Sequence, residues 1–366
     1  MDFDGVNVAE AWAEAARAVP RERFVPAVAL LGVLPGSPTS WIDRDLDPEG
    51  WWRAVRSNAA IAVQLDDGVL DIEDKPAAPF AVATSSCSAP SLVFSMLDLL
   101  SADKGDVVLE IGTGTGWTAG LLAARLGPDN VVSVEIDPAV AARARSNLRS
   151  VGLAPSVIVG DGALGHPERA PYDRVHVTCG VTRIPYEWVR QSKPGGVIVL
   201  PWMPGWQTGH VARLTVVDGV ATGRFHGPSG FMLMRAQRPP EVPITGEPRE
   251  SVSTLDPHDF ASAPEGLALT IAGLLPDVRG RAAAHSDGTL HVAVRHGDSH
   301  ALAVFPPDAP EADVTQRGPR DLWDELEDAV HRWNAWNRPG PDRFGLTVTP
   351  DGQYVWLDSP DTPVRT

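Results

Sequence analysis

The stretch that most constrains this chain is VVLEIGTGTGW, residues 107–117. Its first residues are apolar and typical of a short buried strand, and Gly112, Gly114 and Gly116 follow before the helical run TAGLLAARL at 118–126. Glycine adopts backbone conformations that other residues avoid, and it lets a ligand approach the backbone closely. The helix N-terminus just beyond offers unpaired N–H groups and a partial positive charge. The stretch therefore predicts a site for a nucleoside-bearing cofactor at the carboxyl end of a parallel strand.

Strands and helices are expected to alternate through the middle of the chain. Apolar, β-branched runs predict strands at 107–111, 131–136, 156–160, 174–179 and 196–201, and helical spacing predicts helices at 116–126, 138–150 and 185–192. Apolar strands separated by helices of about ten residues indicate a parallel sheet covered on both faces. A hairpin at 210–225, with its turn at Asp218-Gly219, would add antiparallel strands. The predicted fold class is α/β, with a Rossmann-like sheet that is mixed and mostly parallel.

The remaining segments predict three domains. Residues 1–80 are expected to form a helical and loop segment that caps the substrate, with loop over 33–50, and 81–238 the cofactor-binding domain. RPPEVPITGEP at 238–248 is typical of a linker. Beyond it, 239–366 is predicted to be an accessory α+β domain that contains an amphipathic helix at 320–338 and a hairpin at 344–358.

The charge balance limits the possible partners. Lys+Arg 31 against Asp+Glu 47 gives −16, which argues against nucleic acid or an anionic membrane as a partner. Residues 241–366 hold 21 acidic and 10 basic side chains, so −11 of this charge lies there, either as a solvated acidic face or as a surface for a basic peptide. Two cysteines, Cys87 and Cys179, imply no disulfide framework, and the acidic N-terminus has no apolar signal core. The expected location is the cytoplasm.

Three strand-end acids bear on the choice of cofactor. The glycine spacing is G-x-G-x-G, whereas a pyrophosphate site is expected to have G-x-G-x-x-G. Glu135 follows Gly114 by 21 residues, where a carboxylate can bind ribose hydroxyls in either class of site. Asp161 and the amide of Gly162 could meet the adenine amino edge, and Glu110 could face a cationic methionine portion. An exposed strand-end carboxylate is the plainer interpretation of each acid, but together they favour S-adenosylmethionine.

A run of small polar residues, ATSSCSAP at 83–90, precedes the apolar helical pattern of 91–100. Pro90 suits the first turn of a helix, so Ser85, Ser86 and Ser88 would lie at the helix entry. Helix N-capping is one interpretation, since serine is a preferred cap. Several hydroxyl and thiol groups in succession exceed what one cap requires, so a ligand-binding role stays open beside it.

These residues resemble the protein-L-isoaspartate O-methyltransferase family. The resemblance rests on LEIGTGTGW, VEIDP, GDG followed by GHPERAPYDRVHVT, QSKPGGVIVLP, PRERFVP and SCSAPSLVFSMLDLL, and it spans roughly 17–236. It implies an S-adenosylmethionine-dependent methyltransferase fold. It also implies that Ser88 lies beside the methyl donor and the substrate carboxylate, as the catalytic residue, with Ser86 in the same cofactor-lining turn. The expected cofactor-binding set is Ser86, Ser88, Glu110, Gly112, Gly114, Glu135, Asp161 and Gly162.

Three departures from the repair enzymes resemble a peptide-maturation branch of that family, which works beside ATP-grasp ligases or lanthipeptide enzymes. They are the expanded segment after FVP, Thr178-Cys179-Gly180 in place of small alanines, and a segment 241–366 expected to have no counterpart in repair enzymes. The resemblance implies methylation of an aspartate in a ribosomal precursor peptide, with closure of the ester to an aspartimide. The alternative is isoaspartate repair on damaged proteins. A third hypothesis makes the C-terminal domain a binding module with residual catalysis.

A carboxylate acceptor needs no general base, because an aspartyl side chain has a pKa near ~3.9 and is ionised at neutral pH. Orientation would supply most of the rate, for which effective molarities contribute on the order of 7–11 kcal/mol. No metal is expected. His296 and His300 are spaced i, i+4, but HGDSH reads as a turn without a carboxylate motif.

Overall fold

A computed structural model describes residues 3, 5–32, 39–76, 81–307, 309 and 311–365. It divides into two compact units. Unit 1 comprises Met1–Cys179, Pro185–Leu200 and Thr215–Gly219, and unit 2 comprises Gly180–Ile184, Pro201–Leu214 and Val220–Thr366. The units divide the chain differently from the predicted ranges 1–80, 81–238 and 239–366, which remain a prediction.

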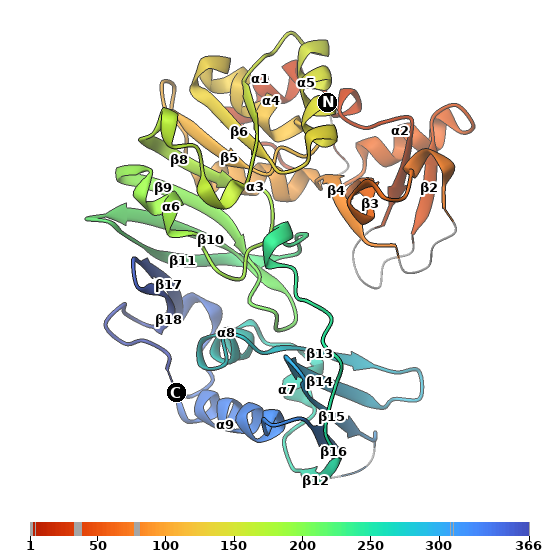
Figure 1. The fold of residues 1–366 in the computed structure, drawn as a ribbon, viewed down its shortest axis with the longest axis vertical. Helices are drawn as coiled ribbons and strands as arrows, with labels where there is room; N and C mark the ends of the chain where they lie inside the picture. The colour runs from red at the N-terminus through yellow and green to blue at the C-terminus, as the bar shows by residue number, and fades with distance from the viewer. Residues whose placement is uncertain are drawn as a thin grey trace. The chain divides into compact units, whose positions relative to one another are not determined.

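A nine-stranded mixed sheet has the order β18-β17-β11-β10-β9-β8-β5-β6-β7. Its strands, in chain order, are β5 (Val108–Ile111), β6 (Val131–Glu135), β7 (Ser156–Val159), β8 (Tyr172–Val177), β9 (Ser192–Trp202), β10 (Gly209–Val217), β11 (Val220–Ser229), β17 (Phe344–Thr349) and β18 (Gly352–Leu357). The strands β7, β6, β5, β8 and β9 are parallel, whereas β11, β17 and β18 pair antiparallel. The predicted mixed and mostly parallel α/β architecture is confirmed (Figure 1).

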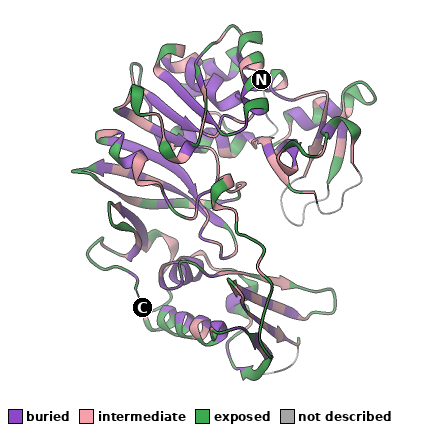
Figure 2. Cartoon of the chain, in the orientation of Figure 1, coloured by how far each residue is buried: buried purple, intermediate pink, exposed green. Residues whose placement is uncertain are grey.

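The helices of the cofactor-binding region follow the predicted alternation. They are α3 (Pro90–Leu100), α4 (Trp117–Leu126), α5 (Pro138–Ser150) and α6 (Tyr186–Arg190), and the N-terminal α1 (Glu10–Ala18) packs on α4. Strands β5 and β6 are buried along their whole length, as Figure 2 shows for the centre of the sheet. They lie between layers of helices, which explains why their sequences are continuous apolar runs rather than alternating ones.

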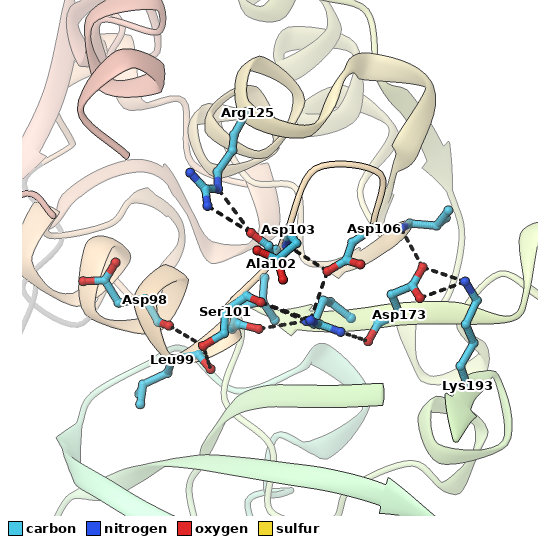
Figure 3. Close-up of polar contacts among 12 residues, drawn as sticks. Asp98, Leu99, Ser101, Ala102, Asp103, Asp106, Arg125, Asp173 and Lys193 are labelled. Atoms are coloured by element: carbon cyan, nitrogen blue, oxygen red, sulfur yellow. Dashed lines mark hydrogen bonds and ion pairs between the residues drawn. The ribbon is translucent and has the colours of Figure 1, made fainter. Parts of the chain in front are cut away.

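The amino-terminal ends of β5 and β8 are held by a polar network on the side away from the glycine-rich turn (Figure 3). The guanidinium of Arg174 pairs with Asp106 at 3.1 Å and donates to the carbonyl oxygens of Leu100 and Ser101. Asp173 accepts from the backbone N–H of Val107 at 2.9 Å and pairs with Lys193 at 2.8 Å. These contacts join the end of α3 to β5, β8 and β9. They lie at the amino-terminal ends of the strands, so the carboxyl ends remain for the candidate site.

The segment ahead of α3 forms a second sheet of order β2-β1-β3-β4. Its elements, with the helix between them, are β1 (Val28–Leu31), β2 (Ser40–Asp43), α2 (Pro48–Arg56), β3 (Ile61–Leu65) and β4 (Ala83–Cys87). The predicted loop over 33–50 is therefore wrong at β2 and at the start of α2, where Asp47 caps the helix by accepting from Gly50 N–H. Residues 33–38 lie outside the described residues.

Unit 2 contains a five-stranded antiparallel sheet of order β12-β16-β15-β14-β13. Its strands are β12 (Arg249–Ser253), β13 (Arg279–Ala284), β14 (Leu290–His296), β15 (Ser299–Phe305) and β16 (Ala312–Arg317), and its helices are α7 (His258–Ala261), α8 (Glu265–Leu274) and α9 (Leu322–Ala335). Helix α9 packs on β14, β15 and β16. The predicted hairpin at 344–358 is present as β17 and β18, but β17 pairs with β11, so it extends the nine-stranded sheet. Within the described part of the chain, no helix is long and apolar enough to span a membrane.

Candidate functional site

The glycine-rich turn joins β5 to α4 with three left-handed residues. Gly112, Gly114 and Gly116 have φ of +93°, +55° and +87°, and Gly116 is the N-cap of α4. A Cβ on Gly112 would lie 2.8 Å from Oγ1 of Thr178, and one on Gly114 would lie 3.5 Å from the carbonyl oxygen of Ser86. The positive φ favours glycine at both positions, and at Gly112 the close approach of Thr178 leaves no room for a Cβ.

Glu135, at the end of β6, is bound directly to this turn. One carboxylate oxygen accepts from Gly114 N–H at 2.9 Å, and the other accepts from Asp137 N–H at 3.1 Å. The side chain is 7% exposed. A carboxylate has about four acceptor positions, so it can accept from a hydroxyl group as well as from backbone N–H groups. Glu135 ends the second parallel strand, as the sequence predicted, and ribose binding stays a prediction.

Glu110 lies on β5, directly before the glycine-rich turn, and is fully buried. Ser133 Oγ donates to one of its carboxylate oxygens at 2.5 Å, and Ser133 Oγ in turn lies 2.5 Å from Oγ1 of Thr113. The other oxygen, Oε1, has no hydrogen-bond partner among the described residues. Burial raises the pKa of Glu110 to about 8, against the hydrogen bond from Ser133, which lowers it. A cation placed against Oε1 would lower this pKa and favour the carboxylate form, which is the form that the role predicted for Glu110 requires.

His176 on β8 pairs in register with Glu110 across the parallel strands. It is 1% exposed, and its Nδ1 has no partner among the described residues. Burial lowers the pKa of His176 to about 4, so the imidazole is neutral at neutral pH. Sequence reasoning missed this residue, although a histidine within the apolar run RVHVT was a visible signal.

Asp161 and Gly162 lie at the end of β7. Asp161 caps a short 3-10 turn by accepting from Ala163 N–H at 2.9 Å, and the carbonyl oxygen of Gly162 accepts from Trp188 Nε1 at 2.8 Å. A pocket of ≈ 430 Å³ opens beside Asp161. Its lining includes Val134, Ile158, Asp161, Leu164, His166 and Arg190. Glu168 and Glu187 also line this pocket, so its walls are partly apolar and partly charged, and the adenine contact predicted for Asp161 stays a prediction.

The serine run is a strand rather than a helix entry. Ala83–Cys87 form β4, and the N-cap of α3 is Ala89, which makes no side-chain capping bond. The capping interpretation is therefore wrong. Ser85 Oγ is buried without a partner among the described residues and lies 3.8 Å from the position of a Cβ on Gly114. Ser86 also touches the turn through its carbonyl oxygen, so β4 forms a second wall of the candidate site.

Arg21, which sequence reasoning did not single out, holds the end of β4. It is fully buried, and its guanidinium donates to five carbonyl oxygens at 2.6–3.1 Å. The acceptors are Val55, Ser57, Ala59, Cys87 and Ser88. The guanidinium carbon also lies 5.3 Å from the ring centroid of Trp117, the first residue of α4. One side chain thus joins the N-terminal sheet, the turn that carries Ser88 and the helix after the glycines.

The residues present fit S-adenosylmethionine. The glycine turn would accommodate the methionine portion, the unpaired Oε1 of Glu110 offers an acceptor for a cation, and Glu135 and Asp161 stand at the next two strand ends. Among the residues that the structure describes, no group of three or more His, Cys, Asp or Glu is arranged to hold a metal ion. Desolvation, and then the charge of Glu135, raise the pKa of Cys179 to about 12, so its thiol is protonated at neutral pH. This argues against a nucleophilic cysteine.

Comparison with known sequences agrees with this geometry. Residues 69–217 match a family model described as protein-L-isoaspartate(D-aspartate) O-methyltransferase. The protein-L-isoaspartate O-methyltransferase of Thermococcus onnurineus is 46% identical over 168 residues, which cover 44% of this chain and 69% of that protein. The chain belongs to the protein-L-isoaspartate O-methyltransferase family. The predicted family is confirmed. The chain covers a smaller share of another relative. The Ignicoccus hospitalis protein of the same name is 40% identical over 129 residues, which cover 34% of this chain and 61% of that protein.

A solved structure named protein-L-isoaspartate O-methyltransferase covers 96% of this chain and 96% of its own, with a TM-score of 0.53 and 22% identity. This likeness confirms the predicted methyltransferase fold class. It also overturns one expectation from the sequence. The segment 241–366 was expected to have no counterpart in such proteins, yet the match extends over nearly the whole chain. Membership of a methyltransferase family likewise supports the predicted enzyme class and the cofactor S-adenosylmethionine.

Proposed function

We propose that this chain transfers a methyl group from S-adenosylmethionine to the free carboxylate of an L-isoaspartyl residue in a polypeptide. The observation that carries the proposal is the extent of the family match. Residues 69–217 include β4 with its serines, the glycine turn, Glu135 and Asp161, so every predicted site residue lies within the matched segment. The match therefore covers both the residues proposed to bind the methyl donor and the serine proposed to contact the acceptor carboxylate.

The chemistry supplied by the cofactor is an electrophilic methyl group on a sulfonium. The acceptor oxygen forms a bond to that carbon as its bond to sulfur breaks, which yields a methyl ester and S-adenosylhomocysteine. The carboxylate is already ionised at neutral pH, since its pKa lies near ~4, so this chain need not remove a proton. Its contribution is to orient the acceptor in line with the methyl group, and good orientation is worth on the order of 7–11 kcal/mol.

The chain's own residues then have distinct proposed roles. Ser88 would donate a hydroxyl hydrogen bond to the acceptor carboxylate, and a neutral donor orients the oxygen without quenching it as a bidentate arginine would. Glu110 would accept from the cationic methionine portion. The proposed cofactor-binding residues are Ser86, Ser88, Glu110, Gly112, Gly114, Glu135, Asp161 and Gly162.

A dedicated peptide-maturation reaction is the second candidate, in which an aspartate of a precursor peptide is methylated and the ester closes to an aspartimide. The chemistry at the methyl group would be the same. The expanded segment between FVP and the serine strand, with β2 and α2, is the observation that favours it. The C-terminal segment no longer does, because a structure named for isoaspartate methylation spans that region too.

The experiment that tests the proposal uses two peptides of one neutral sequence, one with L-isoaspartate and one with L-aspartate at the same position. Incorporation of label from methyl-labelled S-adenosylmethionine is measured for the whole chain and for Ser88→Ala. We expect turnover on the isoaspartyl peptide only, and strong loss in the variant. Equal turnover on the aspartyl peptide would contradict the assignment to isoaspartate methylation. No turnover on either peptide would also contradict it and would favour a dedicated precursor peptide as the substrate.

A further inference from the structure

The five-stranded sheet of unit 2 has one face covered by α9 and an opposite, open face that is only partly covered, where Val242 lies against Arg295 and Gly205 lies against Arg279. Helix α9 packs on β14, β15 and β16, and the side chains directed to it are buried, as in Val292, Val294 and Ala303. Residues on alternate positions of β14 and β15 are half-buried, which gives both strands an alternating pattern. Because successive side chains of a strand point to opposite faces, the half-buried set forms the open face.

A row of basic side chains crosses this open face in register. Arg279 on β13 pairs with Arg295 on β14, Arg295 pairs with His300 on β15, and His300 pairs with Arg317 on β16. Arg281, two residues along β13, lies on the same face. One end of the face therefore gathers four arginines and a histidine, which we call the basic row, while Asp313 on β16 and Glu250 on β12 lie farther along the same face.

Opposed like charges on neighbouring strands destabilise a sheet, so this arrangement has a cost. The like charges also act on the pKa values of the row's members. Burial lowers the pKa of His300, and the charges of Arg295 and Arg317 lower it further. Burial and Arg295 likewise lower the pKa of Arg279. A cluster that disfavours its own charged forms is stabilised when an anion lies against it.

The other arginines of the C-terminal segment are mostly satisfied by acids. Ion pairs join Arg249, Arg320, Arg338 and Arg343 to the carboxylates of Asp321, Glu325, Asp259 and Asp358. Among the described residues, no ion pair joins any arginine of the basic row to a carboxylate. Arg295 donates instead to the carbonyl oxygen of Val242, which holds it in place without neutralising it. The segment 241–366 contains 21 acidic side chains. The basic row therefore lacks ion pairs because of where its arginines lie, and not because the segment has few acids.

We propose that the basic row binds an acidic segment of a polypeptide substrate. The proposal deepens the proposed function, on which the word substrate rests. Four adjacent strands spaced by about 4.8 Å span roughly 14 Å, the length of about four residues of extended chain. A short run of Asp and Glu matches that span. A nucleic acid longer than the row is disfavoured by the net charge of −11 over 241–366, whereas a run of about four acidic residues is matched to the row alone.

The test measures binding and needs no methyl transfer. Fluorescence anisotropy follows a labelled peptide of four consecutive Glu residues flanked by Gly, with a Gln/Gly peptide of the same length and a single-stranded oligonucleotide of equal charge as comparisons. The variant R281Q/R317Q removes two exposed charges from the row. The matched control R332Q/R365Q removes two exposed charges from α9 and the C-terminal segment. We expect the acidic peptide to bind about tenfold more weakly to the first variant and within twofold of the parent to the control.

Charge reversal gives a second variant, R281E/R317E, which should bind a Lys/Gly peptide in preference to the acidic one. Thermal unfolding of each variant checks that the sheet remains folded. Equal weakening in R281Q/R317Q and R332Q/R365Q, no binding of the acidic peptide at low salt, or tighter binding of the oligonucleotide would each overturn the proposal. A failure of methyl transfer on isoaspartyl peptides, with the binding pattern intact, would instead remove only the proposed function.

Discussion

The guanidinium of Arg21 donates a hydrogen bond of 2.9 Å to the carbonyl oxygen of Ser88, 67 residues away in the chain. The same Nη2 also donates to the carbonyl oxygen of Cys87 at 3.1 Å, so two successive carbonyl groups at the end of β4 are held. Because these bonds are to carbonyl oxygens, they do not involve the Ser88 hydroxyl. Arg21 is therefore a positioning residue for the proposed methyl-transfer site rather than a group that touches the reacting atoms.

Replacing Arg21 with methionine should lower both stability and turnover. The change leaves several buried carbonyl oxygens without donors, at a cost of about 1–3 kcal/mol for each. We expect the free energy of unfolding to fall by roughly 3 kcal/mol or more, measured by urea denaturation. Arg23→Met is the matched control, since Arg23 is exposed in the same segment, and it should change stability by less than about 0.5 kcal/mol.

Arg21→Ala offers a test of positioning that does not depend on stability alone. Added guanidinium at low concentration should restore part of kcat in this variant, because the small cation can occupy the vacated space and donate to the same carbonyl oxygens. Cofactor affinity should change little. A variant that folds, binds S-adenosylhomocysteine normally and keeps full kcat would show that the turn holds Ser88 without Arg21.

Glu110→Gln should remove a pH dependence of stability. The native pKa of Glu110 is raised to about 8 by burial, from 4.5 for an unperturbed group. The folded state therefore keeps a proton that the unfolded chain loses, and this contribution to stability is complete below pH 4.5 and disappears as the pH rises to about 8. Glutamine does not titrate, so the variant should lack this decline, which is worth on the order of 4 kcal/mol.

The measurement is urea unfolding at several pH values between 5 and 8 for both proteins, compared as a difference. The difference matters because buried His176 titrates with the opposite sign, since its native pKa is lowered to about 4 from 6.5. Its effect is expected in both proteins and cancels. Parallel curves for the two proteins over this range would show that the Glu110 carboxyl is ionised throughout in the native state.

The central sheet could be predicted from sequence because its signals are local. The helix at 138–150 has the bounds of α5, and strand 107–111 differs from β5 by one residue. Buried β-branched strands and glycine turns can each be recognised from a stretch of about ten residues. Predictions failed where the strand that an element pairs with is distant in the sequence. The serine run resembled a helix entry, yet pairing with β3 makes it a strand, with Ile61 opposite Cys87.

The site was predictable in its strand-end residues and not in its supports. Glu135 lies against Gly114 because both follow parallel strands whose carboxyl ends meet at one sheet edge. Arg21 and His176 carry no motif of their own. Arg21 gains its role only through contacts 34 to 67 residues away, and His176 only through register with Glu110. Such roles depend on tertiary packing, which local patterns do not encode.

Gly114→Ala should weaken cofactor binding more than it weakens the fold. The added methyl group would lie 3.5 Å from the Ser86 carbonyl oxygen and 3.8 Å from Ser85 Oγ, inside the space between the two walls of the candidate site. We expect about tenfold weaker binding of S-adenosylhomocysteine by calorimetry, with a loss of about 1 kcal/mol in stability from the left-handed backbone. Gly152→Ala is the matched control. Its φ is +76° and its Cβ would meet nothing within 4 Å, so it should share the strain and leave affinity unchanged.

Glu135→Gln tests whether this carboxylate binds hydroxyl groups of the cofactor. In the native protein its two oxygens accept from Gly114 N–H and Asp137 N–H, and glutamine can replace only one of these acceptors while it presents an N–H₂ group to the other donor. Loss of hydrogen bonds to a charged acceptor costs roughly 1.5–3 kcal/mol, so affinity for S-adenosylhomocysteine should fall by about 10- to 100-fold. Homocysteine, which has no ribose, separates the two roles of Glu135. If its weak binding falls by the same factor, Glu135 acts through the shape of the glycine turn and not through the ribose.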